Sequence, residues 1–171
     1  LSSGIASTLS FPALNLGEQV RGLAAVIPPS LPTPAMGDML ALTTFARTAG
    51  TTTTFGHRLL SLNRDQPTKP CTTVTVSGLD VAETIKAIDV RPLDGALYAL
   101  SSQGTLYTLD AATGVATRKS DLSASNTDVG DPYTALPTAE FGMDFDAGGV
   151  FRPDGSVTDS LVIVSTGGET L

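Results

Sequence analysis

Three six-residue stretches of the chain are nearly the same: Met39-Leu-Ala-Leu-Thr-Thr44, Leu97-Tyr-Ala-Leu-Ser-Ser102 and Leu161-Val-Ile-Val-Ser-Thr166. Each combines apolar residues with a closing pair of hydroxyl residues, so the chain contains an internal repeat. A repeat sets the architecture before any single element is assigned. We expect each stretch to form the same strand of a repeated all-β unit.

The central copy of the repeat predicts four short strands. Pro92 removes a ladder donor, Gly104 accepts a positive φ, and Asp110-Ala-Ala-Thr-Gly114 offers a turn closed by glycine. Successive side chains of a strand alternate between faces, and both faces of Leu97–Ser102 are largely apolar. Such a strand belongs inside a stack of sheets packed face to face. The four expected strands are Glu83–Pro92, Gly95–Ser102, Thr105–Asp110 and Val115–Ser120.

The other two copies keep part of this unit. The first copy matches the second to fourth strands, with Leu59-Leu-Ser-Leu-Asn63 in the third position, and the last copy matches the first two. The predicted units are 38–80, 81–139 and 140–171. The excess length of the copies falls in three stretches that we expect to be enlarged loops, namely 45–56, 121–139 and 147–158.

A further resemblance rests on the central copy and the segment after it. The residues that carry it are Ser77-Gly-Leu79, Glu83–Pro92, Asp94–Leu100, Gly104–Gly114 and Phe141-Gly-Met-Asp-Phe-Asp146. Over residues 37–171 the chain resembles a bacterial family known as the DUF4394 domain. The resemblance implies a β-propeller-like repeat of four-stranded antiparallel sheets, with about two and a half blades in this chain. It brings no catalytic residue, because the family has no assigned activity.

A propeller needs at least four blades to close, so the expected fold leaves sheet edges to be covered. Open edges of apolar sheet associate readily, and we expect other protein chains, the same or different, to cover them. Additional strands of a longer polypeptide are the alternative. The size of 171 residues and the apolar share of 41% are sufficient for one core.

The charge of the chain argues against nucleic acid as a partner. The net charge is −7, and only ten Lys and Arg residues are scattered along the sequence. Binding to phosphates needs clustered basic residues, and anionic membranes are disfavoured for the same reason. The abundance of Ser, Thr, Gly and Ala with few lysines resembles exported bacterial proteins. We therefore expect an extracellular, cell-surface or periplasmic location.

Residues 1–37 differ from the repeat and predict an extended, apolar, proline-rich arm. The uncharged run 1–17 is too short for a membrane span and contains Pro12, and no basic residue precedes it as in a signal peptide. Flexible linkers are polar, whereas this arm is apolar, so we expect it to pack on its own domain or on a partner. The candidate contact residues are Phe11, Leu14, Leu16, Val26 and Ile27.

Carboxylates offer the one candidate metal site, formed by Asp144, Asp146 and Asp154. Calcium takes oxygen ligands from such residues. The alternative is that Asp144, like Asp89 at the equivalent repeat position, accepts hydrogen bonds from backbone amides of the following turn, with no cofactor bound. His57 and Cys71 are the only residues of their kinds, and we expect both to be structural.

These observations lead to three hypotheses about function. The first is a non-catalytic binding or structural component of an exported bacterial assembly, which acts through loops and sheet edges on a rigid frame. The second is a metal-dependent hydrolase of the propeller type that holds calcium at Asp144 and Asp146. The third is a self-assembling extracellular fibre or sheath subunit.

Overall fold

The chain folds into antiparallel β-sheets in the computed structural model, which describes residues 19–25, 37–124, 133–136, 140–151 and 157–166. These ranges contain ten strands and no helix, which confirms the predicted all-β class. No helix in the described part of the chain has the length and apolar character needed to cross a membrane.

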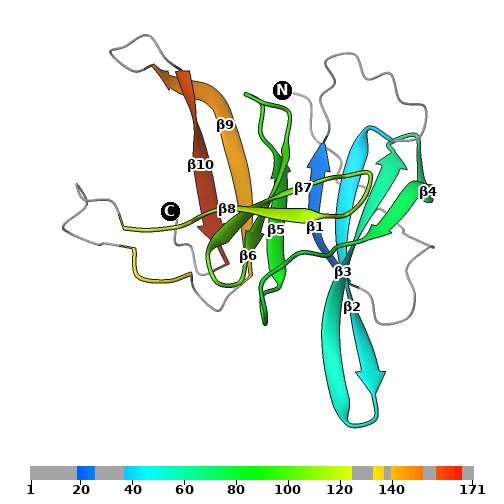
Figure 1. Cartoon of the computed structure of the whole chain (residues 1–171). Coiled ribbons are helices and arrows are strands. Elements are labelled where there is room, and N and C mark those ends of the chain that lie inside the picture. The colour runs from blue at the N-terminus through cyan, green and yellow to red at the C-terminus, as the bar shows by residue number, and fades with distance from the viewer. Residues whose placement is uncertain (1–18, 26–36, 125–132, 137–139, 152–156, 167–171) are drawn as a thin grey trace.

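The first sheet has four strands in sequence order (Figure 1). They are β1 (Gln19–Ala25), β2 (Met39–Ala49), β3 (Thr52–Asn63) and β4 (Gln66–Thr75).

The second sheet repeats the same antiparallel order, and the third sheet is a pair. The second sheet contains β5 (Ile85–Val90), β6 (Leu97–Ser101), β7 (Thr105–Leu109) and β8 (Ala116–Asp121). The third sheet contains β9 (Phe141–Phe151) and β10 (Val157–Ser165). The four strands predicted from the central copy thus correspond to β5–β8.

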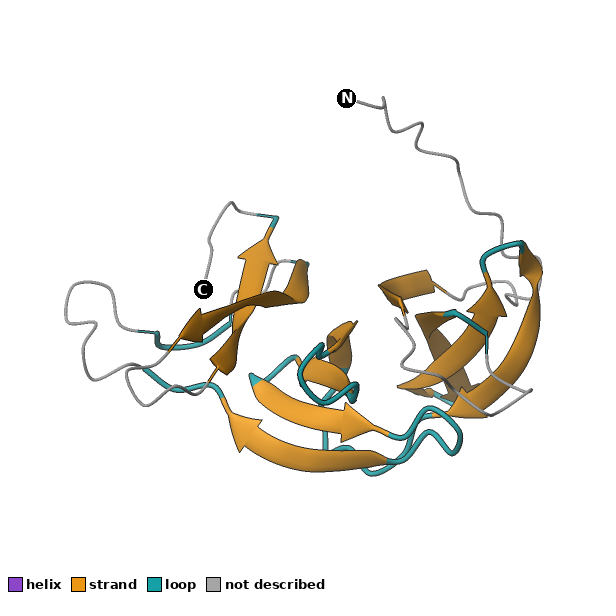
Figure 2. Ribbon diagram, turned by 90° about the horizontal axis from the view of Figure 1, so that it is seen from above, coloured by secondary structure: helices purple, strands orange, loops and turns teal. Residues whose placement is uncertain are grey.

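The three sheets stand side by side along an arc, as Figure 2 shows from above. The first strands of neighbouring sheets approach one another, since β1 contacts β5 and β5 contacts β9. The sheets pack through their faces, as the apolar character of both sides of Leu97–Ser102 predicts.

The first sheet begins within the segment that we expected to be an arm. β1 pairs antiparallel with β2, from Gln19 opposite Thr44 to Ala25 opposite Met39. It supplies the first strand that the sequence repeat lacked. A register shift between Val20 and Gly22 breaks the two-residue period, which explains why the pattern gave no sign of a strand there.

The prediction of a loop over 45–56 is wrong. β2 and β3 remain paired without a shift from Met39 opposite Leu62 to Ala49 opposite Thr52, and they form a long hairpin that projects from the sheet (Figure 1). Its threonines are β-branched and fit a strand, and the Thr48 and Thr53 hydroxyls lie 3.1 Å apart across it. Repeated polar residues were interpreted as a loop, although threonine favours extended backbone.

Of the loops expected over 121–139 and 147–158, the first agrees with the structure in its described residues and the second does not. β9 extends to Phe151 and β10 starts at Val157, so strands occupy most of the second stretch. In the first stretch, β8 ends at Asp121, and the described residues 122–124 and 133–136 have no regular structure.

Ala82 has a positive φ of 68°, which is unusual for a residue with a β-carbon. It lies in the turn closed by the hydrogen bond from the Glu83 N–H to the Asp80 carbonyl. We expect Ala82→Gly to raise the free energy of unfolding by about 0.5 kcal/mol, because relief of the left-handed strain outweighs the added freedom of the unfolded chain. Urea unfolding would measure the change. Ala112→Gly, in a turn of ordinary φ, is the control and should lower stability; a loss in both variants would contradict the prediction.

Candidate interaction surfaces

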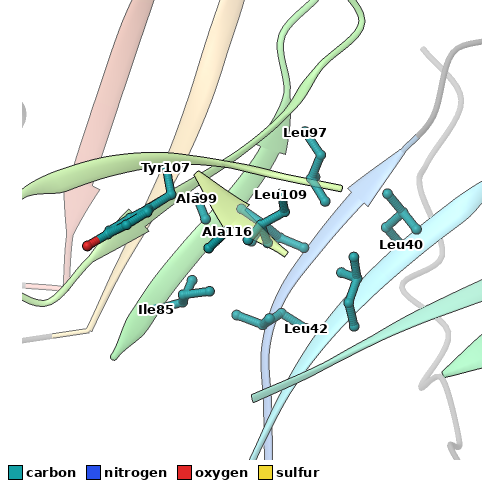
Figure 3. Close-up of a cluster of buried hydrophobic side chains, with 10 residues drawn as sticks. Leu40, Leu42, Ile85, Leu97, Ala99, Tyr107, Leu109 and Ala116 are labelled. Carbon is teal, nitrogen blue, oxygen red and sulfur yellow. The ribbon is translucent and has the colours of Figure 1, made fainter. Parts of the chain in front are cut away.

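Between the first and second sheets lies the largest apolar cluster of the described residues (Figure 3). Leu40 and Leu42 of β2 and Leu59 of β3 meet side chains from all four strands of the second sheet. The latter are Ile85, Ile88, Leu97, Ala99, Tyr107, Leu109 and Ala116. Together these side chains hold the two sheets face to face.

The second and third sheets meet in the same manner. Ala87 and Leu100 of the second sheet are buried against Phe141 and Met143 of β9 and Ile163 of β10. Tyr98 packs at the margin, with its ring centroid 5.1 Å from that of Phe145. The sheets are therefore joined by equivalent apolar faces on either side of the second sheet.

Repeat positions keep the same direction in all three sheets. We call the face of a sheet that is turned toward the next sheet along the chain its downstream face, and the opposite one its upstream face. Leu42 and Leu100 occupy one repeat position on the downstream faces of the first and second sheets, and both are 0% exposed. Val164 occupies the same position in the third sheet and is 49% exposed. The third sheet thus presents a downstream face that, among the described residues, no further sheet covers.

Asp89 and Asp144 also occupy one repeat position, on the downstream faces of the second and third sheets. Asp89 on β5 accepts a hydrogen bond of 2.8 Å from the backbone N–H of Phe145, the residue that β9 presents to it. The structure therefore corrects the expected partner, which was an amide of the following turn. Asp144 is the repeat equivalent of Asp89 and is exposed on the downstream face of the third sheet, beside Gly142. Its carboxylate occupies the position from which Asp89 bonds to the next sheet.

Among the described residues, no three His, Cys, Asp or Glu side chains come together in a way that could hold a metal ion. Of the three predicted ligands, Asp144 and Asp146 lie two residues apart on exposed positions of β9, opposite Val162 and Ser160 of β10. Asp154 lies outside the described residues.

His57 links the first two sheets. The ring is buried on β3, and its Nε2 accepts a hydrogen bond of 2.9 Å from the backbone N–H of Ile85, the first residue of β5. Its Nδ1 lies 3.2 Å from the Thr44 hydroxyl. Because Nε2 accepts, the neutral ring carries its proton on Nδ1 and donates it to Thr44. A structural role for this residue is what the sequence led us to expect.

We predict that His57→Leu lowers the free energy of unfolding by about 2 kcal/mol, because the buried N–H of Ile85 loses its acceptor. Thr44→Val removes only the second partner of the ring and should cost less, about 0.5–1 kcal/mol. Chemical denaturation of both variants gives the comparison. Equal losses in the free energy of unfolding for the two variants would show that the hydrogen bond from Ile85 to His57 contributes no more than the bond from His57 to Thr44.

A second buried polar group lies in the second sheet. The hydroxyl of Tyr107 donates to Glu83 at 2.7 Å and accepts from the backbone N–H of Asp80 at 3.2 Å. Thr105 donates to the other carboxylate oxygen of Glu83 at 2.9 Å. Burial, followed by the hydrogen bond to Glu83, raises the pKa of Tyr107 to about 12. These hydrogen bonds link the loop that precedes β5 to strand β7. They leave the Tyr107 hydroxyl buried, so it is not available as a nucleophile at the surface.

An ion pair between Arg91, which follows β5, and Asp159 of β10 links the second sheet to the third. Asp159 of β10 lies 3.3 Å from Nε of Arg91 and accepts the backbone N–H of Leu93 at 3.1 Å. Its side chain is only 5% exposed. Asp94 accepts from Arg91 at 3.3 Å and from the Tyr98 hydroxyl at 3.2 Å. Sequence reasoning did not find Asp159 as a partner of Arg91 and Leu93, because it is distant from both along the chain.

An open hollow of about 670 Å³ lies where β2 passes the ends of β6 and β7. Its lining is mostly apolar, with Leu40 on one side and Val90, Leu97 and Leu109 on the other. Asp110 also lines the hollow. Its carboxylate accepts hydrogen bonds from the backbone N–H groups of Ala112 and Thr113, which hold its pKa below the usual value. The hollow therefore offers mainly apolar contact.

The predicted partner-binding residues Phe11, Leu14, Leu16, Val26 and Ile27 lie outside the described residues. Cys71 is exposed on β4, the outer strand of the first sheet.

The family described as "Domain of unknown function (DUF4394)" matches residues 58–170, which is more than half of the chain. The chain belongs to the DUF4394 family. The match begins in β3 and includes the whole second sheet and both strands of the third, but not β2, which carries the first copy of the repeated stretch. No curated protein and no solved structure matches the chain.

Proposed function

We propose that this DUF4394 chain is a β-propeller-like module that serves as a binding or structural component of an exported bacterial protein assembly. It works through surface complementarity at the downstream face of the third sheet and at the free edge of β10. The proposal needs no chemical step.

The arrangement of the sheets supports a propeller-like frame. Both four-stranded sheets are simple meanders, with antiparallel neighbours in chain order. Their first strands lie side by side along the inner side of the arc in Figure 2, as the inner strands of propeller blades do. The two four-stranded sheets and the two-stranded third sheet form only part of a ring.

The open downstream face of the third sheet is the single observation that carries the proposal. Val164 is the exposed equivalent of the buried Leu100, Gly142 that of Ala87, and Asp144 that of Asp89. A β-carbon added at Gly142 would meet nothing within 4 Å. This face therefore has an apolar residue, a small residue and a carboxylate at the positions where the second sheet has Leu100, Ala87 and Asp89, and the third sheet covers the second at those positions. We infer that a further sheet of the same type docks on it.

The free edge of β10 supports the same conclusion. β2 and β6, the strands at the same repeat position, are each covered on this side by a third strand, β3 or β7. β10 carries Leu161, Val162, Ile163 and Val164 in succession and has no such neighbour in the described structure. An apolar edge of this kind recruits an additional strand. The composition, rich in Ser, Thr, Gly and Ala, is consistent with export.

Cysteine labelling can test this proposal. In a Cys71→Ser background, Val164→Cys should react fully with a thiol-reactive fluorophore in the isolated chain, because the position is open. In the assembly secreted by producing cells, the same cysteine should be protected at least tenfold.

Val81→Cys provides the matched control, because Val81 is 96% exposed and lies on a turn away from this face. Its labelling should be the same in both preparations. If Val164→Cys in the secreted material reacts as fast as Val81→Cys, no partner covers the face and the proposal is wrong.

A further inference from the structure

The long hairpin formed by β2 and β3 extends beyond the contacts between the sheets. We call residues 45–56 of this hairpin, between Phe45 and Gly56, the distal hairpin. All its residues from Ala46 to Phe55 are exposed. A two-stranded hairpin standing alone in water is only marginally stable, so an element of this length gains from additional strands.

Both long edges of the distal hairpin lack a neighbouring strand in the described structure. On the β2 side, β1 pairs only as far as Gln19 opposite Thr44. On the β3 side, β4 pairs as far as Thr75 opposite Arg58, and the N–H of Val76 makes the last bond, 2.9 Å to the carbonyl of His57. Beyond these points the backbone groups of Thr52–Phe55 are available to a new strand.

The edges of β4 and β8, the last strands of the two four-stranded sheets, are protected against such pairing. β4 carries Pro67, Lys69 and Pro70 and has two register shifts against β3. β8 carries Arg118 and Lys119 and has a register shift against β7. Prolines, charged side chains and bulges are the devices that keep sheet edges apart. The β3 edge over Thr52–Phe55 has none of them.

The two faces of the distal hairpin differ. On one face the ring of Phe45 covers Gly56, where a β-carbon would come within 2.6 Å of it, and the guanidinium of Arg58 lies 4.5 Å from the ring centre. On the other face Phe55, which is opposite Ala46, is 64% exposed. An apolar aromatic ring is thus available beside the unprotected edge.

Charge indicates which partner fits this edge. The chain carries a net charge of −7, so two copies repel one another over most of their surfaces. The hairpin strands from Thr44 to Asn63 contain Arg47 and Arg58 but no acidic residue. The β3 edge over Thr52–Phe55 is itself uncharged, and Arg47 lies on β2, the strand away from this edge. Two copies can therefore lie against one another along this edge without bringing like charges side by side.

We propose that the β3 edge over Thr52–Phe55 pairs antiparallel with the same edge of a second copy. The two distal hairpins then form one four-stranded sheet across a twofold axis, with threonine side chains paired and the two Phe55 rings on one face. This contact is distinct from the downstream face of the third sheet, so it can exist whether or not that face is covered.

Sedimentation over a range of concentrations tests the contact. We expect the chain to form dimers, and Thr53→Lys or Phe55→Lys to weaken the dimer at least tenfold by placing charges in the shared sheet. Thr73→Lys, on the protected and exposed edge of β4, is the control and should leave the dimer unchanged. A chain that stays monomeric at every concentration, or a dimer that Thr53→Lys does not weaken, would overturn the proposal.

Oxidative cross-linking identifies the edge. In the Cys71→Ser background, cysteine at position 53 or 54 should give a disulfide-linked dimer, since residues near the twofold axis face their own copies. Cysteine at position 48, on the β2 side of the hairpin, should not. Cross-linking through position 48 alone would overturn the proposal. Labelling of Val164→Cys is measured separately, so failure of this contact is distinguishable from failure of the proposed function.

Discussion

Leu100→Ala is expected to lower the free energy of unfolding by about 3 kcal/mol, and Leu42→Ala by a similar amount. Both side chains are fully buried between sheets, so truncation removes apolar contacts and leaves a cavity. Val164→Ala, at the same repeat position, should cost less than about 0.5 kcal/mol in the isolated chain, because Val164 is 49% exposed and no further sheet of the described residues covers that face.

Equilibrium unfolding in urea would measure all three variants. The set is internally controlled, because the residues share one position in the repeat and differ in whether another sheet follows. A loss of 2 kcal/mol or more for Val164→Ala would mean that the downstream face is already covered in the isolated chain. A small loss for Leu42→Ala would contradict the packing of the first two sheets.

The repeat made much of this fold predictable from the sequence. Period-two apolar residues bounded by Pro92, Gly95 and Gly104 located β5–β8, and the similarity of Leu59–Asn63 to Leu106–Asp110 located β3. The same correspondence predicts packing: Leu59 and Leu106 lie in the clusters toward the following sheet, whereas Tyr107 lies in the cluster toward the preceding one. Local pattern is sufficient where strands are regular.

Two of the failures, at β1 and at the distal hairpin, have local causes. β1 contains a register shift, so its apolar residues do not alternate. The few apolar residues of the distal hairpin follow no two-residue period, because the hairpin is largely exposed and apolar periodicity detects only burial. Intrinsic preference was the remaining signal there, since the four threonines from Thr51 to Thr54 favour extended backbone.

The candidate surfaces were less predictable than the strands. Asp144 and Asp89 were recognised as equivalents, but the acceptor role of Asp89 depends on Phe145, 56 residues away. The bond from Ile85 to His57 likewise spans 28 residues. Contacts between sheets depend on how the sheets stack, and no spacing in one sequence encodes them.

Tyr107→Phe should lower the free energy of unfolding by about 1–2 kcal/mol at neutral pH, because Glu83 loses the donor 2.7 Å away. It should also change the response to alkali. The folded state raises the pKa of this phenol from 10.0 to about 12, so its neutral form is favoured by folding. This contribution is complete below pH 10 and is lost as the pH rises from 10 to 12.

Two pKa units correspond to about 2–3 kcal/mol, which the wild-type chain should lose over that range and Tyr107→Phe should not. Unfolding in urea at several pH values gives the difference between the two chains. Tyr98→Phe is the control, since the Tyr98 hydroxyl bonds to an exposed carboxylate, and it should keep the alkaline loss of the wild type. If wild type and Tyr107→Phe lose stability in parallel above pH 10, the phenol of Tyr107 is not held neutral by the fold, and the link between β7 and the loop before β5 is weaker than its geometry indicates.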